Sequence, residues 1–401
     1  MNLNKMSEID IVIIGGGIIG CSIAYELSKN KNKQIILLEK NKKINGENQS
    51  SRNSGVIHSG IYYDKSSSPI KANLCIRGNE MLYEFCNKYK IKHRKTGKLL
   101  IATKDFEEEY LDDVLRISLE NNVPNVRRIE INEAKKFEPN INGISGLYVP
   151  TSGIIDPTDM IKTLQGLSKD NGVDFLTSTE VITIESKENK FKLKIKNQDK
   201  EEDLEAKVII NSAGLYSDEI AKKLSPKSEY KIKPVRGESA KFYPKRERIK
   251  HNGLNIYPAP YGYYNDTGER DSVRFSEFLR LLREKKIEKT VGIHLTPTFD
   301  NGMVTIGPGK TTGMGKEDYG SNLKNPDYFY EKVKDFYPNL RLEDIQLHQA
   351  GIMAVPDNFK DWVIKEDSEY PNCINLIGID SPGLTSCLAI AEYVKELYQS
   401  R

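Results

Sequence analysis

Apolar runs and amphipathic stretches alternate at the amino terminus of the chain. Residues 9–14 are mostly isoleucine and valine, which is typical of a short strand covered on both faces. Residues 21–30 carry their apolar side chains on one side of a helix, and a second apolar run, 34–39, ends in an acid. The pattern predicts a strand, turn, helix and strand in succession.

Two later stretches show the same order of apolar run, small-residue turn and helix. "KVIINSAGLYSD" (207–218) predicts a strand that returns to the first unit. "CINLIGIDSPGLTSCLAIAEYVKEL" predicts a strand that ends near Ile379 and a helix from about Thr385. Alternating apolar and polar residues at 191–196 predict a hairpin beside the same unit.

The chain therefore divides into two interleaved units, and the predicted fold class is α/β. Residues 1–84, 146–227 and 346–401 are expected to build a Rossmann-type nucleotide-binding domain. Residues 85–145 and 228–345 are expected to build a second, mixed-sheet domain that binds the substrate.

The turn after the first strand has the spacing G-x-G-x-x-G, formed by Gly15, Gly17 and Gly20. In such a turn the first glycine permits the tight bend, the second lets the backbone approach a pyrophosphate, and the third lets helix and strand pack closely. Glu39 follows at about the distance where an acid binds ribose hydroxyls, which favours FAD or NAD over NADP. These residues predict a dinucleotide site without choosing between the two cofactors.

Charge and cysteine usage narrow the classes of function. The 401 residues include 60 Lys and Arg against 57 Asp and Glu, and no basic module with interleaved aromatics occurs, so we expect no nucleic-acid partner. Five cysteines form no C-x-x-C pair and no cluster with histidine, so no metal site is indicated and a reduced, cytoplasmic setting is expected. No apolar run is long enough for a membrane span.

"NQSSRNSGVIHSGIYY" (48–63), coming after the glycine turn, resembles the D-amino-acid-oxidase-type flavoprotein superfamily. More narrowly, the chain is similar to the L-2-hydroxyglutarate dehydrogenase/oxidase group, through "GKLLIAT" (97–103), "NIYPAP" (255–260) and "GIHLTPTFDNGMVTIGP" (292–308). "NSGVIHSG" also occurs in glycerol-3-phosphate oxidases. The likeness covers nearly the whole chain and implies FAD as the cofactor, held in a glutathione-reductase-like FAD fold.

The resemblance implies cofactor contacts from several segments of the chain. Gln49 and Ser50 are expected near the pyrophosphate, and the last helix is expected to point its N-terminus at the flavin, where its dipole would stabilise the reduced form. The full expected set is Gly15, Gly17, Gly20, Glu39, Lys40, Gln49, Ser50, Ser54, Gly55, Val56, Val181, Ala213, Gly214, Gly383, Leu384 and Thr385.

Three side chains are candidates for catalysis. Oxidation of a secondary alcohol removes a hydride from carbon and a proton from oxygen, and a neutral histidine is suited to take that proton. His58, inside the glycine-rich segment expected over the flavin, is the predicted base. His294 is a candidate for binding a carboxylate and Tyr257 for donating a hydroxyl, although each could instead be a packed residue of the second sheet.

The expected function is FAD-dependent oxidation of a small anionic 2-hydroxy acid, L-2-hydroxyglutarate first. Alternatives are a glycerol-3-phosphate oxidase or dehydrogenase, a flavin amine or amino-acid oxidase, and a non-catalytic electron-transfer or assembly subunit. Oxygen, a quinone and a carrier protein all stay open as electron acceptor.

Two departures from the resembled pattern concern the substrate. Met353 stands where relatives carry an arginine that can grip an anion. An insertion, 261–290, contains a predicted amphipathic helix at 274–289. Three interpretations of the insertion compete: a plain surface helix, a lid that supplies the missing cation from Arg270 or Arg274, or a docking element for a partner or an anionic membrane surface.

Overall fold

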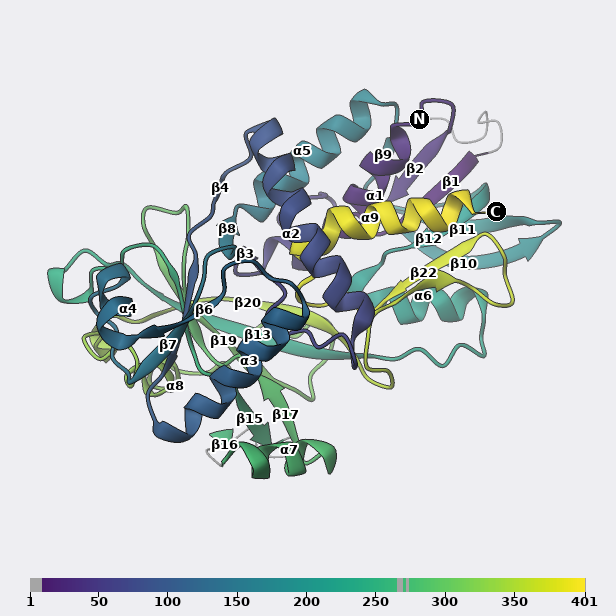
Figure 1. Cartoon of the computed structure of the whole chain (residues 1–401). Coiled ribbons are helices and arrows are strands. Elements are labelled where there is room, and N and C mark those ends of the chain that lie inside the picture. The colour runs from purple at the N-terminus through teal and green to yellow at the C-terminus, as the bar shows by residue number, and fades with distance from the viewer. Residues whose placement is uncertain (1–8, 265–269, 272–273, 401) are drawn as a thin grey trace.

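The computed structural model describes residues 9–264, 270–271 and 274–400, with no account of the side chains at 261–273 and 288–289. Two large sheets lie side by side and meet through their connecting segments (Figure 1). The glycine turn belongs to the first sheet, and the second sheet contains most strands of the domain expected to bind the substrate.

The first sheet is built around β1 (Ile9–Ile14), which pairs in parallel with β12 (Lys200–Asn211) and β2 (Ile35–Leu38). Its other strands are β9 (Asp174–Leu176), β10 (Thr179–Lys187), β11 (Lys190–Asn197), β21 (Val363–Glu366) and β22 (Cys373–Ile377). The short β-branched strands are buried on both faces, as their composition predicts.

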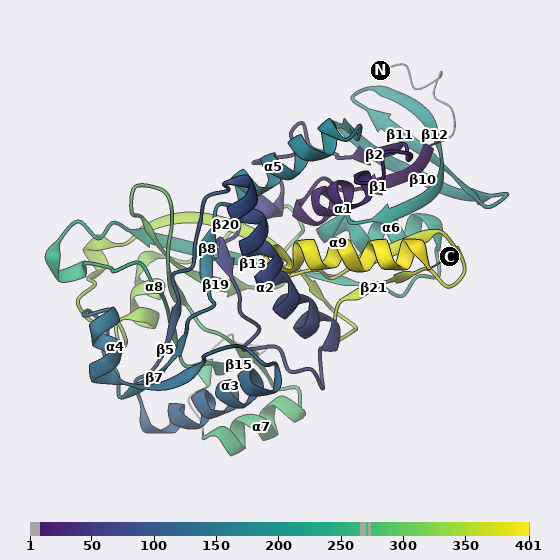
Figure 2. The same cartoon turned by 45° about the horizontal axis from the view of Figure 1, so that its top comes forward.

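Helices cover one face of this sheet and form its largest apolar core. They are α1 (Ile18–Ser28), α2 (Pro69–Tyr89), α5 (Pro157–Asp170) and α9 (Gly383–Gln399). The other face packs against α6 (Ser217–Leu224) and the β10–β11 hairpin. The helix α2 crosses the start of α9 at Gly78, where a Cβ would lie 2.5 Å from the Thr385 carbonyl oxygen (Figure 2). A glycine is therefore required for this close crossing.

The second sheet has eight strands in the order β20-β13-β19-β18-β14-β5-β7-β6. Their bounds are β5 (Lys98–Ala102), β6 (Arg127–Glu130), β7 (Ser145–Val149), β13 (Ile232–Phe242), β14 (Asn255–Pro258), β18 (His294–Pro297), β19 (Val304–Thr311) and β20 (Gln346–Pro356). Alternate side chains divide between the two faces. Leu99 and Ile256 pack toward α4 (Ile131–Phe137) and α8 (Pro326–Val333), while Leu100 and Tyr257 point the other way, toward α3 (Glu108–Glu120).

Two strands lie in a different sheet from the one that the sequence assigned them to. Residues 146–149 and 346–356 were expected in the nucleotide-binding unit, but β7 pairs with β5 and β20 pairs along its length with β13. The reason is that strand pairing is decided by partners distant in sequence, which local periodicity does not reveal. A small third sheet joins β3 (Val56–Ile57), β4 (His93–Arg94) and β8 (Gly153–Ile155), between the two large ones.

The insertion forms β15 (Tyr261–Tyr264), β16 (Arg270–Asp271), β17 (Ile287–Thr290) and a helix shorter than predicted, α7 (Phe275–Arg283). The chain leaves the helix at Lys285, whose φ of 56° is left-handed, and then pairs with β15. The apolar face of α7 is not free, because Phe278 and Leu281 pack with Phe275 against Tyr110 of α3. Figure 2 shows α7 alongside α3 at one end of the molecule.

Candidate flavin and substrate site

The glycine turn has the geometry that its spacing predicts. Gly15 adopts a φ of 106°, and a Cβ there would lie 2.6 Å from the Ser212 carbonyl oxygen. A Cβ on Gly20 would overlap the Gly15 carbonyl oxygen, so this glycine lets α1 pack onto the turn. Gly17 instead lies at the N-cap of α1 and faces a cavity, with Ser50 Oγ 3.1 Å from the position of a Cβ. These are the three roles expected at a pyrophosphate site.

Glu39 lies at the end of β2 beside this turn. Its Oε2 accepts a hydrogen bond from the Gly16 N–H (2.8 Å) and its Oε1 accepts one from the Asn41 N–H (2.9 Å). Burial raises the pKa of the carboxyl, and these backbone donors oppose that effect. Each oxygen keeps a lone pair, so the acid can also accept from ribose hydroxyls.

Two other expected cofactor residues, Lys40 and Val181, lie close to Glu39 in the fold. The Lys40 ammonium lies 3.4 Å from the ring centroid of Tyr216 and 3.6 Å from Glu317 Oε1. The Thr179 N–H donates to the Glu39 carbonyl (2.9 Å), which brings the start of β10, with buried Val181, next to the acid.

A cavity of about 620 Å³ runs between the two sheets from the α1 N-terminus to the α9 N-terminus. Its lining joins the residues after the glycine turn to those at the start of α9, and Glu39 lies outside it. Of the expected cofactor residues, those lining it are Gly17, Gln49, Ser50, Ser54, Val56, Gly214, Gly383 and Leu384, and those outside its lining are Gly15, Gly20, Glu39, Lys40, Gly55, Val181, Ala213 and Thr385. Met353 also faces the cavity.

His58 lies where this cavity meets the second sheet, and its backbone is held on both sides. Its N–H donates to Thr385 Oγ1 (2.9 Å) at the start of α9, and its carbonyl accepts from Asn79 Nδ2 (2.7 Å) of α2. The ring Nε2 lies 3.3 Å from Ser381 Oγ, while Nδ1 is buried and has no hydrogen-bond partner among the described residues. Burial, and then the charge of Lys98, hold the pKa of His58 well below its usual value. The imidazole is therefore neutral near pH 7 and keeps one nitrogen free to accept a proton.

The structure brings the other two catalytic candidates into contact. Tyr257 and His294 occupy neighbouring positions on β14 and β18, and their rings stack with centroids 3.9 Å apart and planes at 7°. Tyr257 is fully buried, and its hydroxyl has no partner among the described residues. The His294 Nδ1 is 2.9 Å from Thr296 Oγ1, and burial lowers the pKa of the imidazole far below its usual value. At neutral pH His294 would bind a ligand as a hydrogen-bonding group rather than as a cation.

Lys98 belongs to this site but was missed by sequence reasoning. Its side chain is fully buried, and its Nζ lies 3.8 Å from the Tyr257 ring centroid and 5.2 Å from that of Tyr62. Burial lowers the pKa of the lysine to about 7. The available signal was a lysine at the start of a buried apolar strand, since lysine is rarely fully buried without a specific role.

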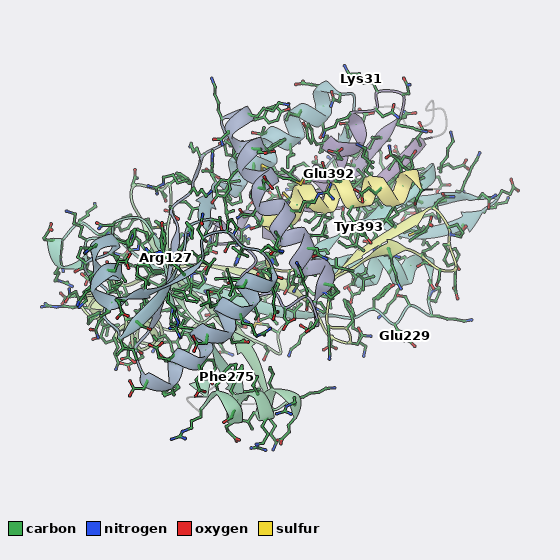
Figure 3. All side chains as sticks on the ribbon, in the orientation of Figure 1. Lys31, Arg127, Glu229, Phe275, Glu392 and Tyr393 are labelled. Carbon is green, nitrogen blue, oxygen red and sulfur yellow. The ribbon has the colours of Figure 1, made fainter. Side chains whose placement is uncertain are left out.

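Of the two arginines that could supply the missing cation, the structure describes the side chain of Arg274 alone, and that side chain does not reach the cavity. Arg274 is exposed at the N-cap of α7 and is absent from the cavity lining, and the side chain of Arg270 lies outside the described residues. Figure 3 shows Phe275, the next residue, well apart from α9, where Glu392 and Tyr393 are labelled. Among the insertion's described side chains, Thr290 lines the cavity, next to Val291 at the return to the second sheet.

Comparisons with known proteins define the class of this site. Residues 10–397 match the family model described as FAD dependent oxidoreductase, and the chain belongs to that family. An L-2-hydroxyglutarate dehydrogenase of Arabidopsis thaliana, described as mitochondrial, is 30% identical over 96% of this chain and 83% of its own. A glycerol 3-phosphate dehydrogenase of Caloramator mitchellensis is 30% identical over 98% of this chain and 74% of its own.

A solved structure gives the same fold with cofactor. The L-alpha-glycerophosphate oxidase of Mycoplasma pneumoniae with FAD bound superposes with a TM-score of 0.83 and 25% identity, covering 98% of this chain and 95% of that one. The protein is an FAD-dependent oxidoreductase, and the glycine turn, Glu39 and the cavity fit that cofactor. Within the described ranges, no helix is both long and apolar enough to cross a membrane.

Thr385→Val is expected to lower the free energy of unfolding by about 1–3 kcal/mol, because it leaves the His58 N–H without its acceptor in a near-isosteric site. Urea unfolding of the flavin-loaded protein measures the change. Thr163→Val, which removes a hydroxyl from the outer side of α5, is the control and should cost less. Equal stability of the Thr385 variant and the native protein would show that the contact does not hold His58.

Proposed function

We propose that this protein oxidises a small 2-hydroxy acid to the 2-oxo acid, with L-2-hydroxyglutarate as the first candidate substrate. The observation that carries the proposal is His58, whose neutral imidazole lines the cofactor cavity with Nε2 beside Ser381. The similarity to L-2-hydroxyglutarate dehydrogenases over nearly the full chain supports the substrate class.

The bound flavin would supply the chemistry of hydride acceptance at N5. The residues of this chain would supply the rest. The imidazole of His58 would accept the hydroxyl proton at Nε2, the ring nitrogen at the accessible edge beside Ser381, and its low pKa suits a base that must be neutral before the reaction. The backbone bonds from His58 to Thr385 and Asn79 would fix the ring over the start of α9. The alcohol thereby loses one hydride and one proton, which balances its oxidation to a ketone.

Glycerol 3-phosphate is the second candidate substrate. Its support is the relative in Caloramator mitchellensis and the structural match to an L-alpha-glycerophosphate oxidase. Both candidates are anionic secondary alcohols, so the same base would serve either. The difference between them is the anion that the second sheet must bind.

Flavin bleaching under anaerobic conditions tests the proposal. The protein is mixed with L-2-hydroxyglutarate, its D-enantiomer, L-lactate, glycerol 3-phosphate and a set of amino acids, and absorbance near the flavin maximum is followed. We expect L-2-hydroxyglutarate to bleach the flavin fastest and the amino acids to leave it oxidised. Bleaching by glycerol 3-phosphate or an amino acid alone would overturn the assignment. No bleaching by any compound would favour a non-catalytic flavoprotein.

A further inference from the structure

Four polar atoms on the substrate side of the cavity are buried without a hydrogen-bond partner among the described residues. They are Lys98 Nζ, the hydroxyls of Tyr62 and Tyr257, and His58 Nδ1. Leaving such groups unpaired is costly, so native proteins bring unsatisfied groups together mainly where a ligand completes them. Tyr62 and His58 line the cavity, while Lys98 and Tyr257 lie outside its lining and contact it through Tyr62 and His294.

The order of strands fixes how these groups are arranged. β14 lies between β5 and β18, with Tyr257 opposite Leu100 of β5 and next to His294 of β18, and Lys98 lies two residues before Leu100 on the same face. The His294 ring occupies one face of the Tyr257 ring at 3.9 Å, and the Lys98 ammonium lies 3.8 Å from the same centroid. The ring of Tyr62 lies close to the same group of side chains, with its centroid 6.4 Å from that of Tyr257.

The ammonium of Lys98 has no counter-charge in the part of the chain that the structure describes. It has no hydrogen-bond partner, and Cys75, the one group that raises its pKa, is a buried thiol whose own pKa is raised to about 12. The acid nearest the base along the cavity wall, Asp380, is already paired with Lys71 at 2.7 Å. The cation–π contacts with the two tyrosine rings offset only part of the cost of burying the Lys98 charge.

The hydrogen-bonding capacity and charge of this cluster indicate the class of ligand that it would bind. An ammonium only donates hydrogen bonds, and two tyrosine hydroxyls can donate as well. A group that accepts several hydrogen bonds and carries negative charge would satisfy them together, and a carboxylate does both.

We propose that Lys98, together with the hydroxyls of Tyr62 and Tyr257, forms the subsite for a carboxylate of the substrate. This inference rests on the proposed function and deepens it, because it assigns the counter-charge that Met353 cannot provide. Lys98 then determines specificity for an anionic substrate, while His58 remains the base.

A dependence of binding on pH follows from the same arrangement. The groups facing the Lys98 ammonium are His58, His294, Tyr62, Tyr257 and Cys75. The pKa values of both imidazoles are lowered and those of the phenols and the thiol are raised, so among these groups Lys98, with a pKa of about 7, is the one that titrates near neutrality. Its positive charge is present below that pH and is lost above it, so binding of an anion weakens as the pH rises.

The test is binding of glutarate, a dicarboxylate that lacks the hydroxyl and cannot be oxidised, to the flavin-loaded protein. The flavin spectrum reports the Kd. Lys98→Met should raise the Kd by at least roughly tenfold, since it removes a charge-assisted contact. In the native protein the Kd should rise by about tenfold per pH unit above neutrality, and in the variant it should be nearly flat. Lys104→Met, at an exposed position just beyond the same strand, is the control for loss of one positive charge and should bind as the native protein does.

A second measurement separates a binding role from a structural one. Without ligand, Lys98→Met should raise the midpoint of thermal unfolding, because it replaces an unpaired buried ammonium with an apolar side chain of similar shape. If Lys98 were needed for the fold, the variant would unfold at a lower temperature than the native protein and would lose its flavin. Native affinity for glutarate in Lys98→Met, or an unchanged pH profile, overturns the subsite.

The outcome for the subsite and the outcome for the proposed function can be told apart. If L-2-hydroxyglutarate bleaches the flavin and Lys98→Met binds glutarate as the native protein does, the proposed function is retained and the subsite is rejected. Glutarate binding that depends on Lys98, in a protein whose flavin no hydroxy acid bleaches, would retain the subsite and reject the function.

Discussion

Flavin reduction by a bound hydroxy acid is expected to slow by about 10²- to 10⁴-fold when His58 is replaced by asparagine, the range for loss of a general base. In the proposed reaction the imidazole of His58 accepts the hydroxyl proton, and asparagine offers no group that can be protonated near neutral pH. A base acts in the transition state, so the rate of reduction should fall far more than the affinity for substrate. Anaerobic stopped-flow measurement of flavin absorbance gives both quantities.

The pH profile gives an independent check on His58. Because burial holds the pKa of this imidazole well below its usual value, the base stays neutral at pH 6.5 and above. The native rate constant for reduction at saturating substrate should therefore be constant there and fall only at more acidic pH, as the imidazole gains a proton. The comparison variant is His294→Asn, which should retain this profile. A native rate of reduction in His58→Asn would place the proton acceptor elsewhere.

Gly17→Val is expected to give a folded but colourless protein. The backbone at Gly17 is extended, with φ −70° and ψ −176°, so valine is tolerated there by the chain itself. Its side chain would occupy the cavity next to Ser50 Oγ, where the pyrophosphate must approach the α1 N-terminus. The measurement is flavin absorbance per protein after purification, together with circular dichroism to show that the fold is kept.

A matched control is available in Gly166→Val. Gly166 lies in α5, and a Cβ there meets nothing within 4 Å, so this variant should remain yellow. A yellow Gly17→Val protein with native flavin content would contradict the pyrophosphate position. Gly20 is not suitable for this test, because a side chain there overlaps the Gly15 carbonyl oxygen and would disturb the fold itself.

The strand, the glycine turn and the start of α9 could be predicted from the sequence because their signals are local. β1 spans the predicted residues, and the glycine spacing assigned Gly15 and Gly20 to roles that the backbone confirms. The start of α9 was also predicted to within two residues, since a Pro-Gly turn precedes an apolar helix. Here residues close in sequence determine the geometry.

The substrate half depends on contacts that are distant in sequence. Lys98, Tyr257 and His294 come together only because β5, β14 and β18 are neighbours in one sheet, an order that no local pattern contains. The same limit explains β20, which was assigned to the first unit by its position in the chain but pairs with β13. The insertion gave a clear amphipathic helix, yet its partner, Tyr110 of α3, could not be identified from periodicity.

The late position of α9 in the chain has a consequence for biosynthesis. During synthesis, β1, the glycine turn and α1 leave the ribosome long before α9, which packs beside α1 and crosses α2 at Gly78. Until then the His58 N–H lacks its Thr385 acceptor, and β22 is only just available to extend the first sheet. Nascent chains should therefore acquire FAD only after α9 has emerged, and a chain interrupted before α9 would present an incomplete nucleotide unit to proteases instead of a partly active enzyme.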